Sequence, residues 1–407
     1  MTKQEPSIGR RSFLGGVAGA GLLALTGCVT ARKIGPNDRI NIGLIGAGRR
    51  GRQIAATLPP DAQLVALADV NTARLAEMNA GKSLRTFTDY RKLLESRDVD
   101  AVLIATPDHW HTLCSVHACQ AGKDVYCEKP LTLTVREGRA MVKAARRYKR
   151  VVQTGSQQRS MTACEDGCRA VSEGRVGKIK EVHGANYPSP WECDLPEQPV
   201  PEGLNWDMWL GQTPVRPYNL DIYLPRAKPG WISFRPWSGG EMTGWGAHGL
   251  DIIQWALGFS ESGPVEVWPE GQGLKCPVSF RYANGVVVKL DGKGPDGGGL
   301  FVGDKGEILI DRGKFEVREG GNTQSTNNGA PSDDKRHMIN WIESIRSRRA
   351  PIADVEIGHR TATMCHLGNI ARWTGRHLKW DPKKETFPGD ADANTYLQRP
   401  MRAPYKL

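Results

Sequence analysis

A glycine-rich turn between two apolar runs constrains the fold more than any other feature of this sequence. Residues 40–45 form a short apolar run rich in β-branched side chains, which predicts a buried strand. The turn at 46–51 follows in the pattern GxGxxG and leads into a helical stretch to about Leu58. A second apolar run, 64–68, ends in Asp69, at the interval where a carboxylate accepts hydrogen bonds from an adenosine ribose. The combination predicts a dinucleotide-binding unit.

Each residue type in this unit has a physical reason. The first glycine permits a tight turn, the second lets a pyrophosphate approach the backbone, and the third lets the helix pack closely on its strand. Asp69 would repel a 2′-phosphate, so NAD is expected rather than NADP, although nearby Arg74 weakens this preference slightly. The dinucleotide contacts expected here are Gly46, Ala47, Gly48, Arg49, Arg50, Gly51 and Asp69.

Strands and helices continue to alternate as far as residue 154, which predicts a parallel, doubly wound (Rossmann) sheet of the α/β class. The expected helices are 72–79, 89–96, 111–121 and 134–149, and the expected strands are 85–88, 101–106, 124–127 and 151–154. The length of 407 residues leaves room for a second domain. We expect a signal at 1–28, a linker at 29–38, the Rossmann domain at 39–155, a substrate and oligomerisation domain at 156–379 and a C-terminal arm at 380–407.

Three polar motifs fall at the carboxyl ends of predicted strands, where such sheets bind their ligands. They are Thr106-Pro107-Asp108-His109-Trp110-His111, Glu128-Lys129-Pro130 and the stretch 153–159. A lysine beside a cationic nicotinamide should have a depressed pKa, which suits Lys129 to proton transfer.

The glycine turn, Asp69, the TPxxxH pattern at 106–111 and the EKP triplet at 128–130, in this order and spacing, resemble the Gfo/Idh/MocA oxidoreductases. This is the family of glucose–fructose oxidoreductase and inositol dehydrogenase, and the resemblance extends from Arg39 to about Thr374. It implies that Lys129 lies between the nicotinamide and a substrate hydroxyl, where it orients the sugar and shuttles a proton. The further dinucleotide contacts that it implies are Thr106, Pro107, His111, Glu128, Lys129 and Gln157.

After about Gly155 the sequence changes to polar loops with tryptophans, followed by alternating strands. This pattern predicts an α+β domain with an open, mainly antiparallel sheet. In the resembled family that sheet covers the substrate and pairs subunits, so a homo-oligomer, a dimer or tetramer, is expected. Residues 320–333 are rich in Asn, Gly and Ser and predict a mobile surface loop. The expected strands are 264–268, 276–282, 286–291, 299–302, 306–311 and 314–318, and helices are expected near 335–347 and 357–374.

His248 is the candidate base of this second domain, where it opens a predicted helix. The family pattern has an Asp four residues before this His, and the chain has Gly244 there, so the substrate and the strength of the dehydrogenase step stay open. Flat indole rings match the C–H faces of sugars, although most tryptophans serve in cores. The candidate substrate-binding residues are Arg159, Tyr187, Arg235, Trp245 and His248.

These features together predict an NAD-dependent oxidoreductase that acts on a hydroxyl of a sugar, polyol or glycoside. His248 would take the hydroxyl proton and Lys129 would polarise the oxygen. Two alternatives stay open. One is a redox-neutral, NAD-dependent glycosidase or lyase that works through a transient keto-sugar. The other is a non-catalytic, lipid-anchored sugar-binding protein, which Gly244 favours and which the presence of Lys129 and His248 disfavours.

The N-terminal residues indicate export. Arg10 and Arg11 precede a weakly hydrophobic, Gly/Ala-rich stretch, 15–25, that is too short to span a bilayer and is typical of a removable twin-arginine signal. The stretch leads to Leu25-Thr26-Gly27-Cys28, which resembles a bacterial lipobox. We therefore expect a periplasmic or cell-envelope protein that acyl chains on Cys28 hold at a membrane surface. Because free NAD is scarce outside the cytoplasm, the cofactor is expected to stay tightly bound.

Charge and cysteine content limit the other partners. The formal net charge of +11 suggests nucleic acid, but no block of five or six basic residues occurs, so no nucleic-acid partner is expected. The cysteines beyond Cys28 include no CxxC pair, and we expect neither a metal site nor a required disulfide.

Overall fold

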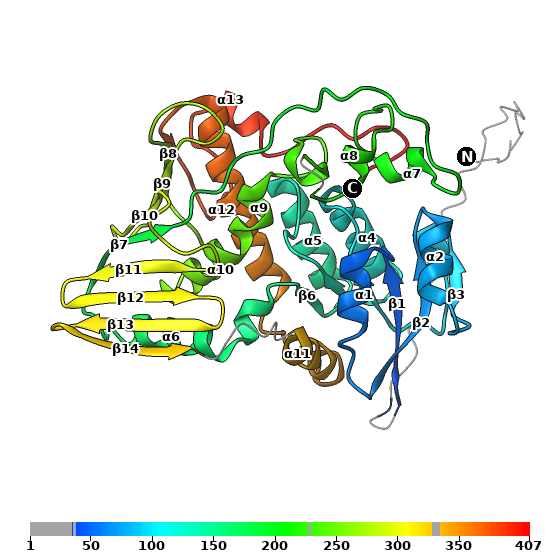
Figure 1. Cartoon of the computed structure of the whole chain (residues 1–407), viewed down its shortest axis with the longest axis horizontal. Coiled ribbons are helices and arrows are strands. Elements are labelled where there is room, and N and C mark those ends of the chain that lie inside the picture. Colours follow the sequence, from blue (N-terminus) through cyan, green and yellow to red (C-terminus); the bar gives the residue numbers. More distant parts are fainter. Residues whose placement is uncertain (1–34, 36–37, 227–228, 328–333) are drawn as a thin grey trace, which may run out of the picture.

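The computed structural model describes residues 35, 38–226, 229–327 and 334–407 (Figure 1). The predicted twin-arginine signal, Cys28 and most of the predicted linker lie outside these residues. Within the described part of the chain, no helix is long and apolar enough to cross a membrane.

The N-terminal half is a parallel sheet in the strand order β3-β2-β1-β4-β5-β6. The order reverses between β1 and β4, and this switch point opens a crevice at the carboxyl ends of the strands. The strands are β1 (Ile40–Ile45), β2 (Ala62–Ala68), β3 (Arg85–Phe87), β4 (Ala101–Ile104), β5 (Asp124–Cys127) and β6 (Val152–Thr154). The helices are α1 (Arg49–Ala55), α2 (Thr72–Asn79), α3 (Tyr90–Leu94), α4 (Asp108–Gln120) and α5 (Val135–Arg147).

Both faces of this sheet are buried, as the uninterrupted apolar strands require. Helices α3, α4 and α5 pack on one face. On the other face, α1 and α2 pack together with α11 (Asp334–Ser347), which contributes Met338 and Trp341 from far along the chain. The prediction of a doubly wound Rossmann sheet is confirmed.

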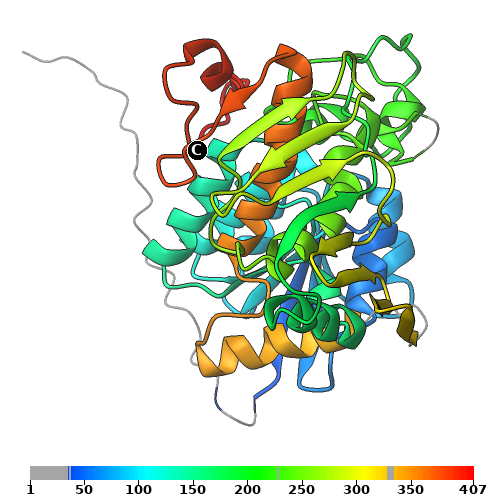
Figure 2. The same cartoon turned by 90° about the vertical axis from the view of Figure 1, so that its left-hand side faces the viewer.

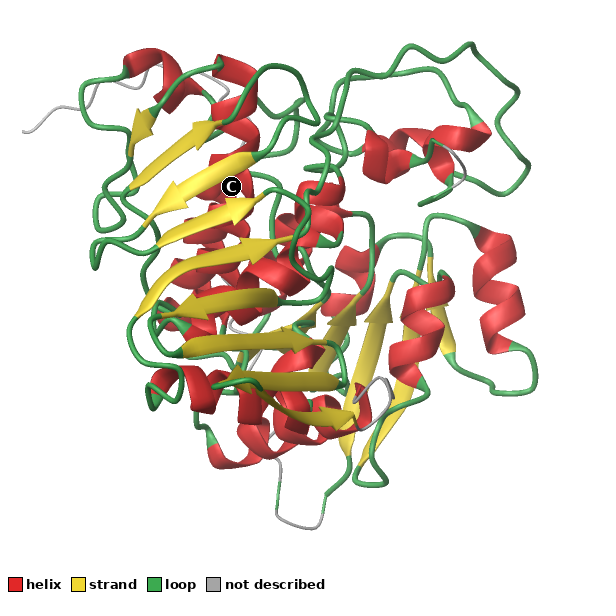
Figure 3. Ribbon diagram, turned by 60° about the vertical axis from the view of Figure 1, so that its left-hand side comes forward, coloured by secondary structure: helices red, strands yellow, loops and turns green. Residues whose placement is uncertain are grey.

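The C-terminal half is built on a sheet in the order β14-β13-β12-β11-β7-β10-β9-β8-β15. Its strand pairs are antiparallel apart from β7 with β10, which confirms the predicted open, mainly antiparallel sheet. One face is uncovered in Figure 2, and Figure 3 shows the same strands in front of their helices. The strands are β7 (Ile179–Gly184), β8 (Glu266–Pro269), β9 (Val278–Arg281), β10 (Val287–Leu290), β11 (Gly299–Gly303), β12 (Gly306–Asp311), β13 (Lys314–Glu319), β14 (Asn322–Asn327) and β15 (Leu378–Lys379).

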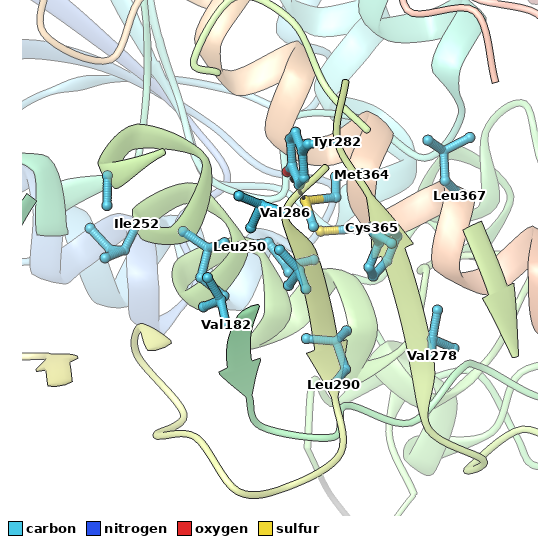
Figure 4. Packing of buried hydrophobic residues seen from close by; sticks show 14 of the residues in the cluster. Val182, Leu250, Ile252, Val278, Tyr282, Val286, Leu290, Met364, Cys365 and Leu367 are labelled. Carbon is cyan, nitrogen blue, oxygen red and sulfur yellow. Dashed lines mark hydrogen bonds between the residues drawn. The ribbon is translucent and has the colours of Figure 1, made fainter. Parts of the chain in front are cut away.

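The covered face carries α6 (Thr162–Ser172), α10 (Gly246–Ala256) and α12 (Val355–Thr374). Figure 4 shows Leu250 and Ile252 of α10 and Met364 of α12 packed with Val182 of β7 and Leu290 of β10. Because α10 begins where this core meets the Rossmann domain, the core fixes the position of the helix that carries His248.

Two expectations about this half were wrong or incomplete. The prediction of a loop over 320–333 was wrong for 322–327, which form the edge strand β14 paired with β13. The rest of that segment, 328–333, lies outside the described residues. The central strand β7 was not expected, because its sequence IKEVHG lacks a clear apolar run.

A third group of elements lies over the mouth of the Rossmann sheet. We call the described residues 190–226 and 229–237 the aromatic cap, because its small core is formed by rings that include Trp206, Trp209 and Trp237. In Figure 1 the cap and the C-terminal end of the chain lie together above α4. The short helices of the cap are α7 (Trp206–Leu210), α8 (Leu220–Tyr223) and η2 (Trp231–Ser233), and α13 (Ala391–Thr395) lies near the chain end. Two further short helices, η1 (Gln157–Ser160) and α9 (Glu241–Gly244), lie outside the cap.

The C-terminal residues pack on their own chain. Tyr405 contacts the ring of Trp110 in α4 with 5.5 Å between ring centroids, and the N–H of Arg402 donates to the carbonyl of Gln212 in the cap at 2.9 Å. The end of the chain therefore braces the cap against the Rossmann domain.

Candidate active site

The glycine turn after β1 has the close contacts that its residue types imply. Gly46 has φ +97°, and a Cβ there would lie 2.7 Å from the carbonyl oxygen of Ala105. A Cβ on Gly51 would lie 2.1 Å from the carbonyl oxygen of Gly46. Helix α1 starts directly after Gly48 with no side-chain cap, so its first N–H groups point into the turn. The turn is therefore a backbone cradle of the kind that holds a pyrophosphate.

Asp69 follows β2 and is tied to this turn. Its carboxylate accepts the N–H of Ala47 at 2.8 Å and the N–H of Asn71 at 2.9 Å. Burial raises the pKa of Asp69, while the nearby guanidinium of Arg74 opposes the shift. Arg74 lies 4.4 Å above the ring of Tyr223 from the aromatic cap. The strand-end carboxylate thus stands beside the glycine turn, as the sequence predicts, with a cation next to it.

A cleft of about 580 Å³, partly open to solvent, runs along these strand ends. Gly46, Gly48 and Asp69 line one end, and Thr106 and Pro107 line the wall after β4. The Thr106 hydroxyl is buried and has no hydrogen-bond partner among the described residues. A glycine cradle, a strand-end carboxylate and an unpartnered hydroxyl in one cleft fit a dinucleotide.

The aromatic cap closes this cleft, which sequence reasoning missed. Met208 and Trp209 of α7 line the cleft opposite the glycine turn. The cap is fastened to the Rossmann domain by backbone hydrogen bonds, Thr72 N–H to Gly203 O at 3.0 Å and Asn205 N–H to Val70 O at 2.9 Å. The concentration of Trp and Tyr between 206 and 237 is the signal that could have indicated a separate packed unit.

Lys129 follows β5 and joins the two halves of the chain. Its Nζ donates to the carbonyl oxygen of Gly244 at 2.8 Å, just before the helix of His248. Burial lowers the pKa of Lys129, an effect that the carboxylates of Glu128 and Asp108 only partly offset. Lys129 is half-buried and its ammonium contacts the second domain, the position expected of a proton-transfer lysine between two domains.

The neighbouring Glu128 is held by an ion-pair network. Nε of Arg50 donates to the Glu128 carboxylate at 2.8 Å, and the other guanidinium nitrogens of Arg50 bind Asp334 of α11 at 2.8 and 2.9 Å. Arg50 therefore ties the glycine helix to the EKP loop, whereas Arg49 is exposed. The predicted dinucleotide contacts of Arg49, Arg50 and Glu128 stay predictions.

His248 lies in the first turn of α10 and is 6% exposed. Its Nδ1 has no hydrogen-bond partner among the described residues, and its Nε2 lies 3.4 Å from Nη2 of Arg312. Burial and the nearby positive charges, Lys129 and Arg312 foremost, hold the pKa of His248 well below its ordinary value. His248 is therefore a neutral imidazole, able to accept a proton, at neutral pH. Trp245 lies beside it with 5.6 Å between ring centroids.

Asp108 and His111 lie in the first turn of α4, which begins three residues before the start expected at 111. Burial raises the pKa of Asp108 to about 6, and its carboxylate accepts the hydroxyl of Ser238 at 2.8 Å. The ring of His111 lies between the carbonyl oxygens of Pro130 at 2.8 Å and Thr106 at 3.0 Å. Burial opposes a charge on His111, but Cys127, Asp108 and the Pro130 carbonyl together raise its pKa to about 10. Sequence reasoning had not singled out Asp108.

Gly244 stands before His248 where the resembled family has an Asp. A Cβ at Gly244 would lie 2.9 Å from the carboxylate of Glu241 and 3.3 Å from the guanidinium of Arg226. These two side chains form an ion pair at 3.0 Å. The space toward which a side chain at 244 would point is therefore already occupied by a charged pair.

The remaining predicted substrate residues have other partners. Arg159 is buried. Its guanidinium donates two hydrogen bonds to Asp251 at 2.8 and 2.9 Å and lies 4.9 Å above Trp255, and its contact with the substrate stays a prediction. The hydroxyl of Tyr187 donates to the carbonyl of Asp296 at 2.6 Å. Arg235 stacks on Trp373 at 4.3 Å and pairs with Glu192. Gln157 is buried at the start of η1, and its Oε1 has no hydrogen-bond partner among the described residues.

The described cysteines are buried, separate thiols. Within the described ranges, no group of three or more His, Cys, Asp or Glu side chains is placed to hold a metal ion.

Comparison with known proteins adds a family context to this geometry. A family model described as an oxidoreductase NAD-binding Rossmann fold matches residues 40–156. A second model, described as the C-terminal alpha/beta domain of the same oxidoreductase family, matches residues 175–407. The two matches together leave only the N-terminal residues and a short connecting segment uncovered.

Named relatives match over most of their own length. The levoglucosan dehydrogenase of Pseudarthrobacter phenanthrenivorans is 28% identical over 281 residues, which are 62% of this chain and 67% of that protein. The inositol 2-dehydrogenase 2 of Saccharopolyspora erythraea is 26% identical over 288 residues, which are 67% of this chain and 73% of that protein.

Solved structures share the fold. Levoglucosan dehydrogenase in complex with NADH and levoglucosan has a TM-score of 0.62 at 18% identity, over 84% of this chain and 99% of that one. The aldose-aldose oxidoreductase of Caulobacter crescentus, complexed with glycerol, has a TM-score of 0.62 at 17% identity with the same coverage of both chains.

Proposed function

This chain belongs to the Gfo/Idh/MocA oxidoreductases, and we propose that it uses NAD to oxidise a hydroxyl group of a sugar or polyol. The observation that carries this proposal is the 2.8 Å hydrogen bond from Nζ of Lys129 to the carbonyl oxygen of Gly244. It joins a lysine at a strand end of the Rossmann domain to the segment that leads into His248 of the second domain. Two proton-transfer groups from different domains therefore lie near each other, and the charge of Lys129 acts on His248.

The two side chains have complementary protonation states. Lys129 carries hydrogen-bond donors that can orient and polarise a hydroxyl oxygen, and its lowered pKa makes proton exchange easier. His248 is neutral, so one nitrogen of its ring is unprotonated and can take the hydroxyl proton. A bound NAD supplies the hydride acceptor. Loss of the proton to His248 strengthens the electron push that expels the hydride from the carbon.

The cofactor preference follows from Asp69. Its carboxylate favours a free ribose 2′-hydroxyl and repels a 2′-phosphate, so NAD is the preferred cofactor. The glycine cradle at Gly46, Gly48 and Gly51 would hold the pyrophosphate, and Thr106 would offer its hydroxyl in the same cleft. The aromatic cap supports tight retention, because Met208 and Trp209 cover the cleft from above.

The cofactor content of the purified protein tests this proposal. Protein prepared without added nucleotide should release NAD on denaturation, identified by chromatography and mass. The Asp69→Ala variant, which lacks the ribose acceptor, should release less NAD. Finding only NADP, or an unchanged NAD content in Asp69→Ala, would contradict the cofactor assignment. A panel of sugars and polyols, read at the nicotinamide absorbance, then tests turnover, and its absence on every compound favours a sugar-binding protein without catalysis.

We also propose a cellular location and an oligomeric state for this protein. Arg10, Arg11 and Cys28 support export by the twin-arginine route and lipid anchoring in the periplasm or cell envelope. The uncovered face of the nine-stranded sheet supports pairing with a second copy, because half-buried Leu300 and Leu309 are cross-strand neighbours on it. Light scattering on the purified protein should give a dimer or tetramer, and a monomer at micromolar concentration would contradict this assembly.

A further inference from the structure

Arg312 is a residue of the second domain that contacts the proposed catalytic His248. It lies in the turn between β12 and β13. Its Nη2 is 3.4 Å from Nε2 of His248, and its guanidinium carbon is 5.4 Å from the ring centroid of Trp245. Trp245 directly follows Gly244, whose carbonyl accepts the hydrogen bond of Lys129. Arg312, His248 and Trp245 therefore lie together, next to the Gly244 carbonyl that Lys129 binds.

The arginines near His248 differ in whether a carboxylate binds them. Arg50 pairs with Glu128 and Asp334, Arg226 pairs with Glu241, and Arg159 pairs with Asp251. Arg312 differs from these arginines. Its hydrogen-bond partners are the imidazole of His248 and the amide oxygen of Gln158, which lies at 3.3 Å. Within the described part of the chain, no carboxylate binds its guanidinium. The partners of Arg312 are neutral, while each neighbouring arginine has an acid.

The side chain of Gln158 is oriented so that it holds Arg312 in position. Gln158 is 1% exposed, and its Nε2 donates to the carbonyl of Gly297, so its Oε1 must face Arg312. The guanidinium is only partly exposed, and burial lowers its pKa, although the nearby carboxylate of Asp334 opposes this shift. A partly buried cation that no carboxylate binds directly is less favourable than a paired one, and an anion that arrives with the substrate reduces this cost. A guanidinium matches a carboxylate in shape, because its planar fork can donate two parallel hydrogen bonds.

We propose that the substrate of this enzyme is an acidic sugar, a uronate or a related sugar carboxylate, and that Arg312 binds its carboxylate. The inference rests on the proposed function and names the substrate class of that same site. With the carboxylate on Arg312, the sugar ring lies along Trp245 and one of its hydroxyls reaches Lys129 and His248. A carboxylate is favoured over a phosphate because only one guanidinium here has no carboxylate bound to it, whereas a phosphate carries up to two negative charges.

The test compares matched substrates and matched variants. The substrates are methyl glycosides of glucose, galactose and mannose, each supplied as the neutral sugar, the uronide and the 6-phosphate. The variants are Arg312→Gln and Arg312→Lys, and the control is Arg281→Gln. Arg281 also lies over a Trp, at 5.5 Å, and pairs with Glu266, but it is exposed on β9. Circular dichroism and thermal unfolding confirm that each variant folds.

The wild type should have a kcat/KM at least tenfold higher for one uronide than for its neutral counterpart. Arg312→Gln should remove this preference, chiefly through a higher KM for the uronide, and Arg312→Lys should keep part of it because a charge remains. Arg281→Gln should keep the wild-type ratio. A dehydrogenase that prefers neutral sugars, or that prefers the 6-phosphates, would overturn the inference and leave the proposed function intact.

Binding measurements separate the two claims if no compound is turned over. Calorimetry on the NAD-loaded wild type should detect the uronide, with at least tenfold weaker binding to Arg312→Gln and unchanged binding to Arg281→Gln. That result would support the acidic ligand while the catalytic proposal fails. Equal binding of the uronide to wild type and Arg312→Gln, or no binding to either, would overturn the inference.

Discussion

Gly244 is the position where this chain differs from the family pattern, which has an Asp there. A Cβ there meets the Glu241 carboxylate at 2.9 Å, so an acid at 244 would add a second negative charge beside Glu241 and compete for Arg226. We expect Gly244→Asp to lower kcat/KM by at least about tenfold, the cost of misplacing a nearby catalytic group. Gly244→Ala should have a smaller effect, because only the flexible end of Glu241 must move. Steady-state kinetics on the best sugar measures both variants.

The double variant Gly244→Asp/Glu241→Gln gives the control for charge. Because it relieves the repulsion between the two carboxylates, it should recover part of the activity lost in Gly244→Asp. Faster hydride transfer in the single variant Gly244→Asp would show instead that the site lacks a carboxylate that it needs.

The ionisation of Asp108 should make the stability of the folded protein depend on pH. Burial raises its pKa to about 6 in the folded protein, above the value of 3.8 in an unfolded chain. The folded state therefore binds this proton more tightly, and the stabilisation that is complete below pH 3.8 is lost as the pH rises through 6. Two pKa units correspond to about 3 kcal/mol in the free energy of unfolding. Asp108→Asn, which keeps an oxygen for the Ser238 hydroxyl, should remove this loss.

Denaturant titrations at pH 4 and pH 7 measure this effect. The difference in unfolding free energy between Asp108→Asn and wild type should shift in favour of the variant as the pH rises from 4 to 7. A difference that is the same at both values would contradict the assigned ionisation of Asp108.

At the scale of elements, the aromatic cap should control how long the dinucleotide stays bound. Met208 of α7 lines the cleft opposite Gly48, so its removal opens a path without disturbing the rings at the centre of the cap. We expect Met208→Ala to raise the NAD dissociation rate by about tenfold, as for the loss of about 1.4 kcal/mol of contact in a bound state. Met401→Ala, a half-buried methionine outside the cleft, is the matched control.

Stopped-flow exchange of bound NAD against an excess of a fluorescent analogue measures the rate. An unchanged rate in Met208→Ala, or the same increase in Met401→Ala, would show that the cap does not gate the cofactor.

The elements that could be predicted are those whose own sequence specifies them. Strand β1 is an apolar run, and the turn after it needs glycines because of its backbone geometry. Both could therefore be predicted from the sequence. Strand β14 was missed because Asn, Thr, Gln and Ser dominate it, and only its pairing with β13 makes it a strand. Strand β7 was missed because IKEVHG has neither a clear apolar run nor a regular alternation of polar and apolar residues, and its neighbours β10 and β11 come from more than a hundred residues later.

The same distinction applies to the site. Lys129 and His248 occur in recognisable local motifs, so the sequence alone indicates them. Arg312 and Met208 have no such motif, and they join the site only because the sheet turn and the cap fold over the Rossmann strands. The ion pair of Arg159 could not be predicted either, because its partner Asp251 lies 92 positions away in the sequence.

At the scale of the whole molecule, the N-terminal residues should decide where the protein works. If Cys28 is acylated, Cys28→Ser should move the mature protein from the membrane fraction to the soluble fraction, because the lipid contribution to membrane binding is lost. The conservative double change Arg10→Lys/Arg11→Lys should leave the protein in the cytoplasm. Cell fractionation with immunodetection measures both, and unchanged distributions of both variants would remove the support for export and anchoring.

The central claim is that Lys129 and His248 act on one substrate oxygen during NAD-dependent oxidation, and turnover of their alanine variants tests it most directly. With the best sugar and bound NAD, Lys129→Ala and His248→Ala should each lower kcat by at least about 100-fold, the lower range for losing a general acid–base group. Both variants should keep the dinucleotide, the double variant should be scarcely worse than either single one, and Lys92→Ala, an exposed lysine paired with Glu95, should match wild type. A wild type without turnover on any sugar, together with alanine variants that bind sugars as well as wild type does, would contradict the account.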